Sequence, residues 1–331
     1  MSDSHTIAVD AMGGDNVPAV PVQGAVMAAR RSGLRVLLIG DADAVAAELA
    51  KEDVTGLDIQ VVPSEGVVNE GEHPVLALRS KPNCSIAVTA GLVKAGKADA
   101  LVSMGSTGAS MAASVLALGK FPGLDRPTLG GPFLSLAPNT TIIDLGANVD
   151  SKPSQLLSFG ALGASFQRIY NKTENPRVAL LSVGSEEGKG NRQVQEAHAL
   201  FSASGLNFVG NVEGHELFQD KADVVVCDGF VGNVLLKFTE GLAEAAAQYL
   251  AKTLGPDSEA VQRIRGLAGA AEHAGGPLFG VNGVAVVGHG RSPAEGITAA
   301  IELAARCLDV GLVEQMQADL AKVLHKAGAE A

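Results

Sequence analysis

The sequence predicts a three-layer α/β/α protein with a largely parallel sheet. Short runs rich in β-branched residues alternate with longer stretches of helical periodicity, which is the pattern of strand–helix–strand units. Several of these runs are continuously apolar, as expected for strands that helices cover on both faces. Apolar residues make up 47% of the chain, enough to bury a sizeable core.

The 331 residues fit either two domains or one large α/β unit. No change of composition and no Pro/Ser-rich linker marks a boundary, so we expect residues 1–331 to form a single unit with two subdomains around a cleft. Helical periodicity is clearest in Ser110–Leu118, Gln155–Tyr170 and Gln193–Phe201. The expected strands are Ile7–Asp10, Val36–Ile39, Ile59–Val62, Ala100–Ser103, Thr141–Leu145, Val178–Val183, Phe208–Val212, Val224–Cys227 and Val284–Val287.

Two stretches break this alternation. Between residues 230 and 272 no strand is predicted, and two consecutive amphipathic helices are expected to form a helical projection. Apolar residues at helical spacing then predict one long C-terminal helix from Pro293 to about Lys326. Ser292 and Glu295 stand where a capping box would place them, so we expect Ser292 to be the N-cap of that helix.

Composition excludes several classes of function. The 36 acidic residues outnumber the 25 basic ones, giving a net charge of −11, whereas binding to a nucleic-acid backbone needs a basic field. Three widely spaced cysteines make no disulfide framework and fit a reducing cytosol. No signal peptide is expected, because the N-terminal residues include Asp3 and form no apolar stretch. No transmembrane helix is expected either, because the uncharged stretch 100–119 is rich in serine and glycine. We therefore expect a cytoplasmic protein without a nucleic-acid partner.

Glycine-rich loops follow most of the predicted strands. In open α/β sheets, ligands bind beyond the carboxyl ends of the strands, and loops of this composition let backbone N–H groups and helix N-termini converge on an anion. Taken singly, each loop could be only a turn. Together they predict an anion-binding cleft, with phosphate as the leading candidate. The loops comprise residues 11–16, 105–109, 144–150, 184–191, 228–233 and 288–291.

Standard catalytic and nucleotide motifs are missing from the sequence. No Gly-x-Gly-x-x-Gly follows the first strand, and no Gly-x-Ser-x-Gly elbow occurs. The stretch from Gly184 to Lys189 resembles a P-loop, but it has one residue too few between its glycines and lacks the following Ser or Thr. No paired metal-ligand motif occurs either, so we expect neither a metal nor a cofactor.

The set of loops resembles that of one known family. Matches in order from Val9 to Arg291 cover nearly the whole chain, and as a set they are highly specific. They are Asp10-Ala11-Met12-Gly13-Gly14-Asp15, Gly105-Ser106-Thr107-Gly108-Ala109, Asp144-Leu145-Gly146-Ala147-Asn148-Val149-Asp150, Gly188-Lys189-Gly190-Asn191, Gly210-Asn211-Val212-Glu213-Gly214, Asp228-Gly229-Phe230-Val231-Gly232-Asn233 and Gly280-Val281-Asn282-Gly283. This pattern is similar to that of the PlsX family of bacterial phosphate acyltransferases.

The resemblance implies both a fold and an activity. Members of that family transfer a long acyl chain from acyl carrier protein to inorganic phosphate, giving acyl phosphate for phospholipid synthesis. Their fold is similar to that of phosphotransacetylases and of isocitrate- and isopropylmalate-type dehydrogenases, and it usually dimerises. The expected partners are therefore acyl carrier protein, inorganic phosphate, a second copy of the chain, and a membrane glycerol-3-phosphate acyltransferase that receives the product.

Site residues are assigned on the same basis. Lys189 is expected to neutralise charge on phosphate or on the developing oxyanion, Asn191 to donate an amide N–H, and His289 to transfer protons. Lys189 could instead be a solvated loop lysine, His289 a structural histidine, and the asparagines helix caps. The acidic loop residues cannot all face phosphate, because like charges repel, so some of them must orient a cation or cap a helix. They are Asp10, Asp15, Asp150 and Asp228. Phosphate or substrate contacts are expected from Gly13, Gly14, Asp15, Ser106, Thr107, Gly108, Asn148, Asp150, Gly188, Gly232 and Asn233.

Two surface contacts are also expected. Acyl carrier protein is acidic and so is this chain, so docking needs a local basic patch. Arg263 and Arg265 are favoured over the group around Arg30 and Arg31. An apolar stripe with Leu254, Val261, Ile264 and Leu267 predicts either a weak contact with the inner membrane surface or dimer packing.

Competing functions stay open at this point. A short-chain phosphotransacetylase acting on acyl-CoA would need a similar phosphate cleft. A non-enzymatic acyl- or phosphate-binding protein would bind ligand without releasing a carrier thiol. A dehydrogenase of related fold is the weakest alternative, because neither a nucleotide fingerprint nor a metal-ligating carboxylate cluster is evident.

Overall fold

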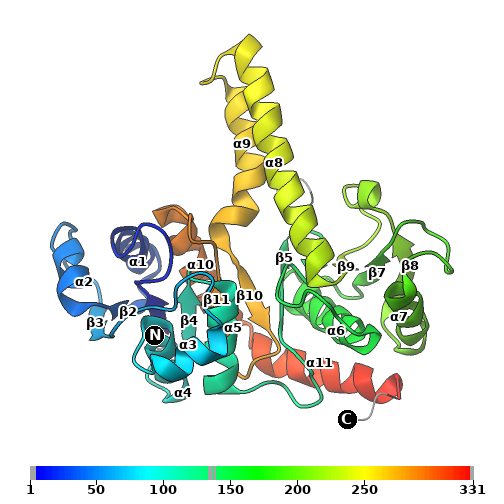
Figure 1. Cartoon of the computed structure of the whole chain (residues 1–331), viewed down its shortest axis with the longest axis horizontal. Coiled ribbons are helices and arrows are strands. Elements are labelled where there is room, and N and C mark those ends of the chain that lie inside the picture. The colour runs from blue at the N-terminus through cyan, green and yellow to red at the C-terminus, as the bar shows by residue number, and fades with distance from the viewer. Residues whose placement is uncertain (1–4, 133–136, 138, 329–331) are drawn as a thin grey trace. The chain divides into compact units, whose positions relative to one another are not determined.

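The computed structural model describes residues 5–132, 137 and 139–328. Contacts between residues divide the chain into two compact units (Figure 1). Unit 1 comprises the described residues up to Phe121 together with Glu272–Val313, and unit 2 comprises those of Pro122–Ala271 and from Glu314 onward. The cleft expected between two subdomains stays a prediction.

The sheet of unit 1 is parallel except at one edge. Its strands follow the order β3-β2-β1-β4-β11-β10, and only β10 runs antiparallel to its neighbour. Helices lie on both of its faces, as the continuously apolar strands require. The strands are β1 (Thr6–Asp10), β2 (Arg35–Gly40), β3 (Ile59–Pro63), β4 (Ala100–Ser103), β10 (Gly276–Phe279) and β11 (Val284–Val287).

Each face of this sheet has its own set of helices. Helix α1 (Ala19–Ser32) packs on α10 (Ala294–Asp309), and the Thr298 hydroxyl donates to the Gly24 carbonyl at 3.0 Å. The α4 side of the sheet buries Ala8 and Ile39 in one apolar cluster. The remaining helices are α2 (Ala42–Leu49), α3 (Pro74–Ser80), α4 (Ser85–Lys94) and α5 (Thr107–Leu118).

The strands of unit 2 follow the order β5-β6-β9-β7-β8 and are parallel except for β5; together they are called the unit 2 sheet. Helix α6 is almost wholly buried and packs on β6, β9 and α7. The opposite face buries Ile142, Ala179 and Val225 beneath Leu217 and Leu235. The elements are β5 (Thr128–Pro132), β6 (Thr141–Ile143), α6 (Pro153–Ile169), β7 (Arg177–Leu181), α7 (Arg192–Ala203), β8 (Asn207–Val212), β9 (Val224–Val226) and α11 (Leu312–Lys326).

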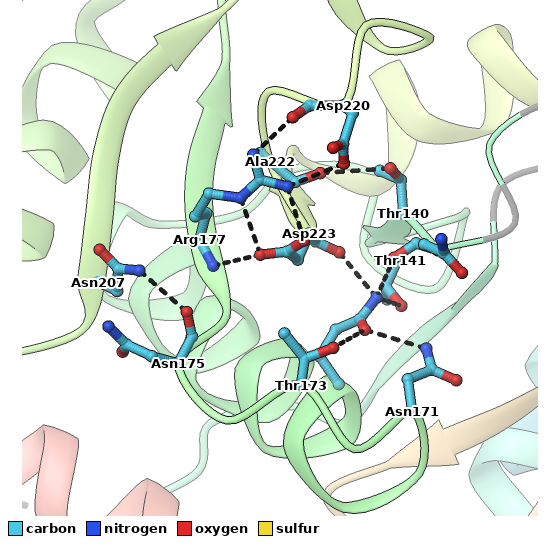
Figure 2. Close-up of polar contacts among 12 residues, drawn as sticks. Thr140, Thr141, Asn171, Thr173, Asn175, Arg177, Asn207, Asp220, Ala222 and Asp223 are labelled. Carbon is cyan, nitrogen blue, oxygen red and sulfur yellow. Dashed lines mark hydrogen bonds and ion pairs between the residues drawn. The ribbon is translucent and has the colours of Figure 1, made fainter.

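The amino-terminal edge of the unit 2 sheet is a closed polar network (Figure 2). The Arg177 guanidinium donates to both carboxylate oxygens of Asp223, from Nε at 3.1 Å and from Nη2 at 2.9 Å. The Gln167 amide donates to the hydroxyl of Thr141 at 3.0 Å and to the Asp223 carbonyl at 2.9 Å. Burial alone would raise the pKa of Asp223, but the hydrogen bonds from Arg177 lower it below its ordinary value.

The predicted fold class is confirmed, and so is each predicted strand, with ends that differ by no more than two residues. Two short antiparallel strands, β5 and β10, were not predicted. The prediction of a single C-terminal helix was wrong, because the chain turns at Gly311, with φ of 59°, between α10 and α11. The prediction that Ser292 is the N-cap of this helix was wrong as well. Pro293 is extended and occupies that position with no side-chain cap, so α10 begins one residue later than expected.

The chain between strands β9 and β10 forms a hairpin of two helices. Helix α8 (Gly229–Leu254) and α9 (Glu259–Ala274) lie side by side in Figure 1. Ala247 and Val261 are fully buried, and Arg265 pairs with Glu244 at 3.5 Å. Val261 therefore faces protein, and Ile264 is half-buried. The side chain of Leu267 lies outside the described part of the structure. In the described residues, no helix is both apolar and long enough to span a bilayer.

Candidate functional site

Three glycine loops meet at the carboxyl ends of the unit 1 strands. A Cβ atom on Gly13 would lie 2.7 Å from the amide nitrogen of Gly105, so the two backbones approach as closely as only glycine permits. The Asp15 amide donates to the Gly290 carbonyl at 2.9 Å. Asp10 is buried beneath these loops and accepts from the Ser103 hydroxyl at 2.8 Å. Burial raises the pKa of Asp10, against the lowering effect of its hydrogen bonds.

The predicted residues of unit 1 surround this junction. Gly14 packs against Gly290, and a carboxylate oxygen of Asp15 lies 3.9 Å from Nε of Arg291, with both side chains exposed. Ser106 is the N-cap of α5 without a side-chain cap bond, and Thr107 and Gly108 form its first turn. His289 lies half-buried in the loop before α10. The cavity lined by Gly13, Gly14, Asp15 and Gly290 has a volume of only ≈ 10 Å³, so these loops pack mainly on one another.

In unit 2, Asp144 organises the loop that follows β6. Its carboxylate is fully buried and accepts from the Gly146 and Ala147 amides at 3.0 and 2.9 Å and from the Asn148 side chain at 2.7 Å. Burial raises its pKa, and these donors offset part of that rise. Asn148 also donates to the Pro127 carbonyl at 2.8 Å, while its own Oδ1 atom is buried without a hydrogen-bond partner.

The first turn of α8 closes on the same loop. Asp228 caps the helix by accepting from the Val231 amide at 2.8 Å, and the Gly229 amide donates to the Asn148 carbonyl at 2.7 Å. A Cβ atom on Gly232 would lie 1.9 Å from the Asp144 carbonyl oxygen, so no other residue fits there. Asn233 lies on the exposed side of that turn, with its amide nitrogen 3.1 Å from the Cβ position of Gly146.

The loop after β7 carries the predicted cation. Lys189 is exposed, and its ammonium group forms no ion pair with the described residues. Its backbone amide donates to the Glu186 carbonyl at 3.0 Å. Asn191 is the N-cap of α7 and accepts from the Val194 amide at 2.9 Å, so the capping role is real. The Gly188 carbonyl accepts from Gln195 at 2.9 Å, which holds the loop against α7.

Sequence reasoning missed a pocket of ≈ 350 Å³ at the start of α6. Asp150 was the only predicted site residue among its lining groups. The available signal was the Lys-Pro pair before a helical pattern, which marks a helix N-terminus, but Arg126 lies in a separate turn with no such mark. The lining residues are Asp125, Arg126, Asp150, Ser151, Lys152 and Gln155.

The two arginines expected to receive a carrier protein already have acidic neighbours. Arg263 lies 2.9 Å from Glu259, four residues earlier on α9, and Arg265 pairs with Glu244 of α8. Both Arg263 and Glu259 are largely exposed, so their pairing is weak. In the described chain, no group of three or more His, Cys, Asp or Glu side chains is arranged to hold a metal ion.

Comparison with solved structures defines the class of fold. A phosphotransacetylase from Streptococcus pyogenes superposes with a TM-score of 0.62 at 18% identity, covering 93% of this chain and 95% of that one. The EutD phosphotransacetylase from Staphylococcus aureus gives 0.59 at 17% identity, with 92% and 94% covered. The chain therefore has the α/β fold found in phosphotransacetylases.

Sequence comparison defines the family. The family model described as "Fatty acid synthesis protein" matches residues 5–315. The phosphate acyltransferase of Nitratidesulfovibrio vulgaris is 44% identical over 92% of this chain and 91% of its own length, and that of Pelotomaculum thermopropionicum is 42% identical over 96% and 95%. The chain belongs to the phosphate acyltransferase family, which confirms the resemblance carried by its glycine loops.

Proposed function

We propose that this chain transfers a long-chain acyl group from the thioester of acyl carrier protein to inorganic phosphate, and that the acyl phosphate serves phospholipid synthesis. The observation that carries the proposal is Lys189: in a member of this family, an exposed ammonium group without an ion pair follows a buried strand at the carboxyl edge of the unit 2 sheet. A phosphate oxygen attacks the thioester carbonyl carbon, the C–S bond breaks, and the thiolate leaves and takes up a proton.

The chemistry needs positioning and charge stabilisation more than a strong base. Phosphate is a poor nucleophile in water because it is strongly hydrated, and fixed N–H donors can replace that hydration while aligning one oxygen on the carbonyl. Lys189 stabilises the developing oxyanion, and the amides of Asn191 and Asn233 donate to phosphate or oxyanion oxygens. Asn148 was expected to be a third donor, but its amide group donates to the Pro127 carbonyl and the Asp144 carboxylate, so this residue positions the loop instead. Asn191 caps α7 with its oxygen, which leaves its Nδ2 group available. His289 transfers the proton. Because a thiolate is a good leaving group, neither a metal nor a cofactor takes part.

The activity is tested by mixing the purified protein with palmitoyl–acyl carrier protein and phosphate. Hydroxylamine-reactive acyl phosphate and free carrier thiol should form in equal amounts. Acetyl-CoA serves as the matched donor for a short-chain phosphotransacetylase. Faster turnover of acetyl-CoA would assign that activity instead, and binding of the acyl carrier without thiol release would assign a binding protein.

A homodimer is part of the proposal. Helix α8 presents an exposed apolar stripe at helical spacing, a feature that monomeric proteins avoid. It consists of Val231, Val234, Phe238, Leu242 and Tyr249, exposed by 38%, 52%, 65%, 56% and 74%. Replacing Phe238 and Leu242 with glutamate should give a monomer in light scattering, whereas an unchanged mass would place the dimer contact elsewhere.

A weak contact with the inner membrane surface is also proposed, because acyl phosphate must reach a membrane glycerol-3-phosphate acyltransferase. Leu254 at the end of α8 is 52% exposed and supports that contact. Leu254→Asp should release the protein from anionic vesicles. Leu116→Asp on α5, where the leucine is 56% exposed, is the matched control. A wild-type protein that does not sediment with vesicles would exclude the contact.

A further inference from the structure

The pocket at the start of α6 has a hydrogen-bond donor that nothing in the described chain satisfies. Gln155 is 6% exposed and lines the pocket. Its Oε1 atom accepts from the Lys152 amide at 2.7 Å, which fixes the side-chain amide in one orientation. The Nε2 group has no acceptor among the described residues. This N–H group therefore lies at the wall of the pocket, where a ligand can supply the acceptor.

The positive charges of the pocket favour an oxyanion. Arg126 and Lys152 both line it, and neither forms an ion pair within the described chain. The pocket also lies at the N-terminus of α6, whose 17 residues direct their positive dipole end toward it. The volume of ≈ 350 Å³ is at the lower end of small-molecule sites, so it suits a small anion and has no room for a long acyl chain.

The two carboxylates of the pocket narrow the choice of anion. Asp125 and Asp150 line the same cavity, and an ionised carboxylate only accepts hydrogen bonds. Sulfate and a phosphodiester are fully ionised near neutral pH, so they offer acceptors alone and are repelled. Orthophosphate at that pH keeps at least one P–OH group, which donates. A pocket that combines cations, an amide donor and carboxylates therefore fits orthophosphate better than either of the other anions.

We propose that this pocket binds the inorganic phosphate consumed in the reaction, with Arg126, Lys152 and Gln155 donating to its oxygens and Asp150 accepting from its P–OH group. The carboxylate makes the site selective for orthophosphate over sulfate and over the phosphodiester in the prosthetic arm of acyl carrier protein. This inference rests on the proposed function only for the role of the bound phosphate as a substrate.

Binding is measured first, with the full chain and inorganic phosphate alone in a calorimeter. Arg126→Gln and Lys152→Gln should each weaken phosphate binding at least about tenfold, the scale of one charge-assisted hydrogen bond. Arg31→Gln and Lys94→Gln, at exposed cations far along the chain, are the matched controls and should bind as the wild type does. Thermal unfolding of every variant shows whether it is folded.

The second measurement is the selectivity of the pocket for phosphate over sulfate, which would not change if Asp150 had only a structural role. Asp150→Asn removes the negative charge and replaces one acceptor oxygen with an N–H donor, so sulfate should become a competitive inhibitor against phosphate at a concentration about tenfold lower than for the wild type. Dimethyl phosphate, a phosphodiester probe, should not compete in the wild type. Competition by dimethyl phosphate would assign the pocket to the carrier's arm and overturn the proposal.

The two proposals fail in different ways. If the wild type forms acyl phosphate while the Arg126 and Lys152 variants keep the wild-type affinity and KM for phosphate, the pocket assignment is wrong and the activity stands. If the wild type binds phosphate at this pocket but makes no acyl phosphate, the binding site stands and the proposed function is wrong.

Discussion

The two edges of the unit 2 sheet differ in how completely their polar groups are satisfied. At the amino-terminal edge, Asp223 accepts from Arg177 through its carboxylate (Figure 2) and from the Gln167 side chain through its backbone carbonyl. At the carboxyl edge, buried oxygens without a hydrogen-bond partner recur. They belong to Thr128 at the start of the antiparallel strand β5, Asn148 after β6, Ser182 after β7 and Asn211 in β8.

The difference separates stability from function within one sheet. A buried oxygen without a donor is unfavourable for folding, whereas the polar groups of the opposite edge are paired within the protein. The cations divide in the same way. Arg177 has carboxylate partners at the amino-terminal edge, whereas Lys189, Arg126 and Lys152 have none within the described chain. Substitution of a paired residue at the amino-terminal edge should therefore change stability, and substitution of an unpaired cation at the carboxyl edge should change activity.

The largest effect is expected where the carboxyl edge is most tightly packed. Gly232→Ala would place a methyl group 1.9 Å from the Asp144 carbonyl oxygen, so α8 or the β6 loop must move. We expect a loss of about 3 kcal/mol in unfolding free energy together with most of the activity. Gly241→Ala, in the same helix with open space around it, should instead stabilise by about 0.5–1 kcal/mol. Denaturant unfolding measures both, and equal stabilities would contradict the close approach.

The second effect is expected in turnover alone. Lys189→Ala should lower kcat by about 10²- to 10³-fold, the scale of removing one preorganised charge stabiliser. Its stability should stay within about 0.5 kcal/mol of the wild type, because the side chain is exposed. Lys97→Ala, an exposed lysine before β4, is the control. Wild-type turnover of the Lys189 variant would make this residue a solvated loop lysine.

Sequence reasoning located the carboxyl edge because apolar strands ending in glycine loops are a local signal. It placed Lys189 and the Asn148 loop correctly in such loops. It could not see β5, whose five residues include two glycines and a proline, or the turn at Gly311, where the apolar period runs on unbroken. The break follows from tertiary packing, and not from a change of pattern.

The α6 pocket escaped prediction for a different reason. Strands β5 and β6 lie between Arg126 and Lys152 in the chain, so no spacing in the sequence links the two residues. Asn191 illustrates a further limit. Its sequence context fits both an anion donor and a helix cap, and only the geometry shows that its oxygen is used for the cap. A pattern identifies which residues are special, whereas the partner of each polar atom is decided by the fold.

The third prediction concerns the satisfied edge. Arg177→Met removes the donors to a half-buried carboxylate and should cost about 2 kcal/mol of unfolding free energy while leaving kcat and the KM for phosphate unchanged. Arg192→Met, which breaks the exposed pair with Glu196, should cost less than about 0.5 kcal/mol. A change in KM at Arg177 with unchanged stability would reverse the roles assigned to the two edges.

The same pair gives a pH dependence of known sign. Arg177 lowers the pKa of Asp223 below its ordinary value of 3.8. The stabilisation is therefore fully present above that ordinary value and is lost as the pH falls through the lower folded value. The stability difference between wild type and Arg177→Met should shrink in acid, below about pH 4, and stay constant from pH 5 to 8. A difference that grows in acid would exclude the carboxylate as the partner.

The smallest effect is expected from the arginines of the hairpin. Arg263 and Arg265 are proposed to receive the acidic carrier, but Glu259 and Glu244 already neutralise them, so the local field is weak. Reversing both arginines to glutamate should raise the KM for acyl carrier substrate by only roughly two- to fivefold, the range of exposed charge pairs, and should spare the KM for phosphate. The defect should fade as salt rises, because screening acts within about 10 Å at 0.1 M. Reversal of Arg30 and Arg31 in unit 1 is the matched comparison. If that pair raises the carrier KM and the hairpin pair does not, the carrier docks on unit 1.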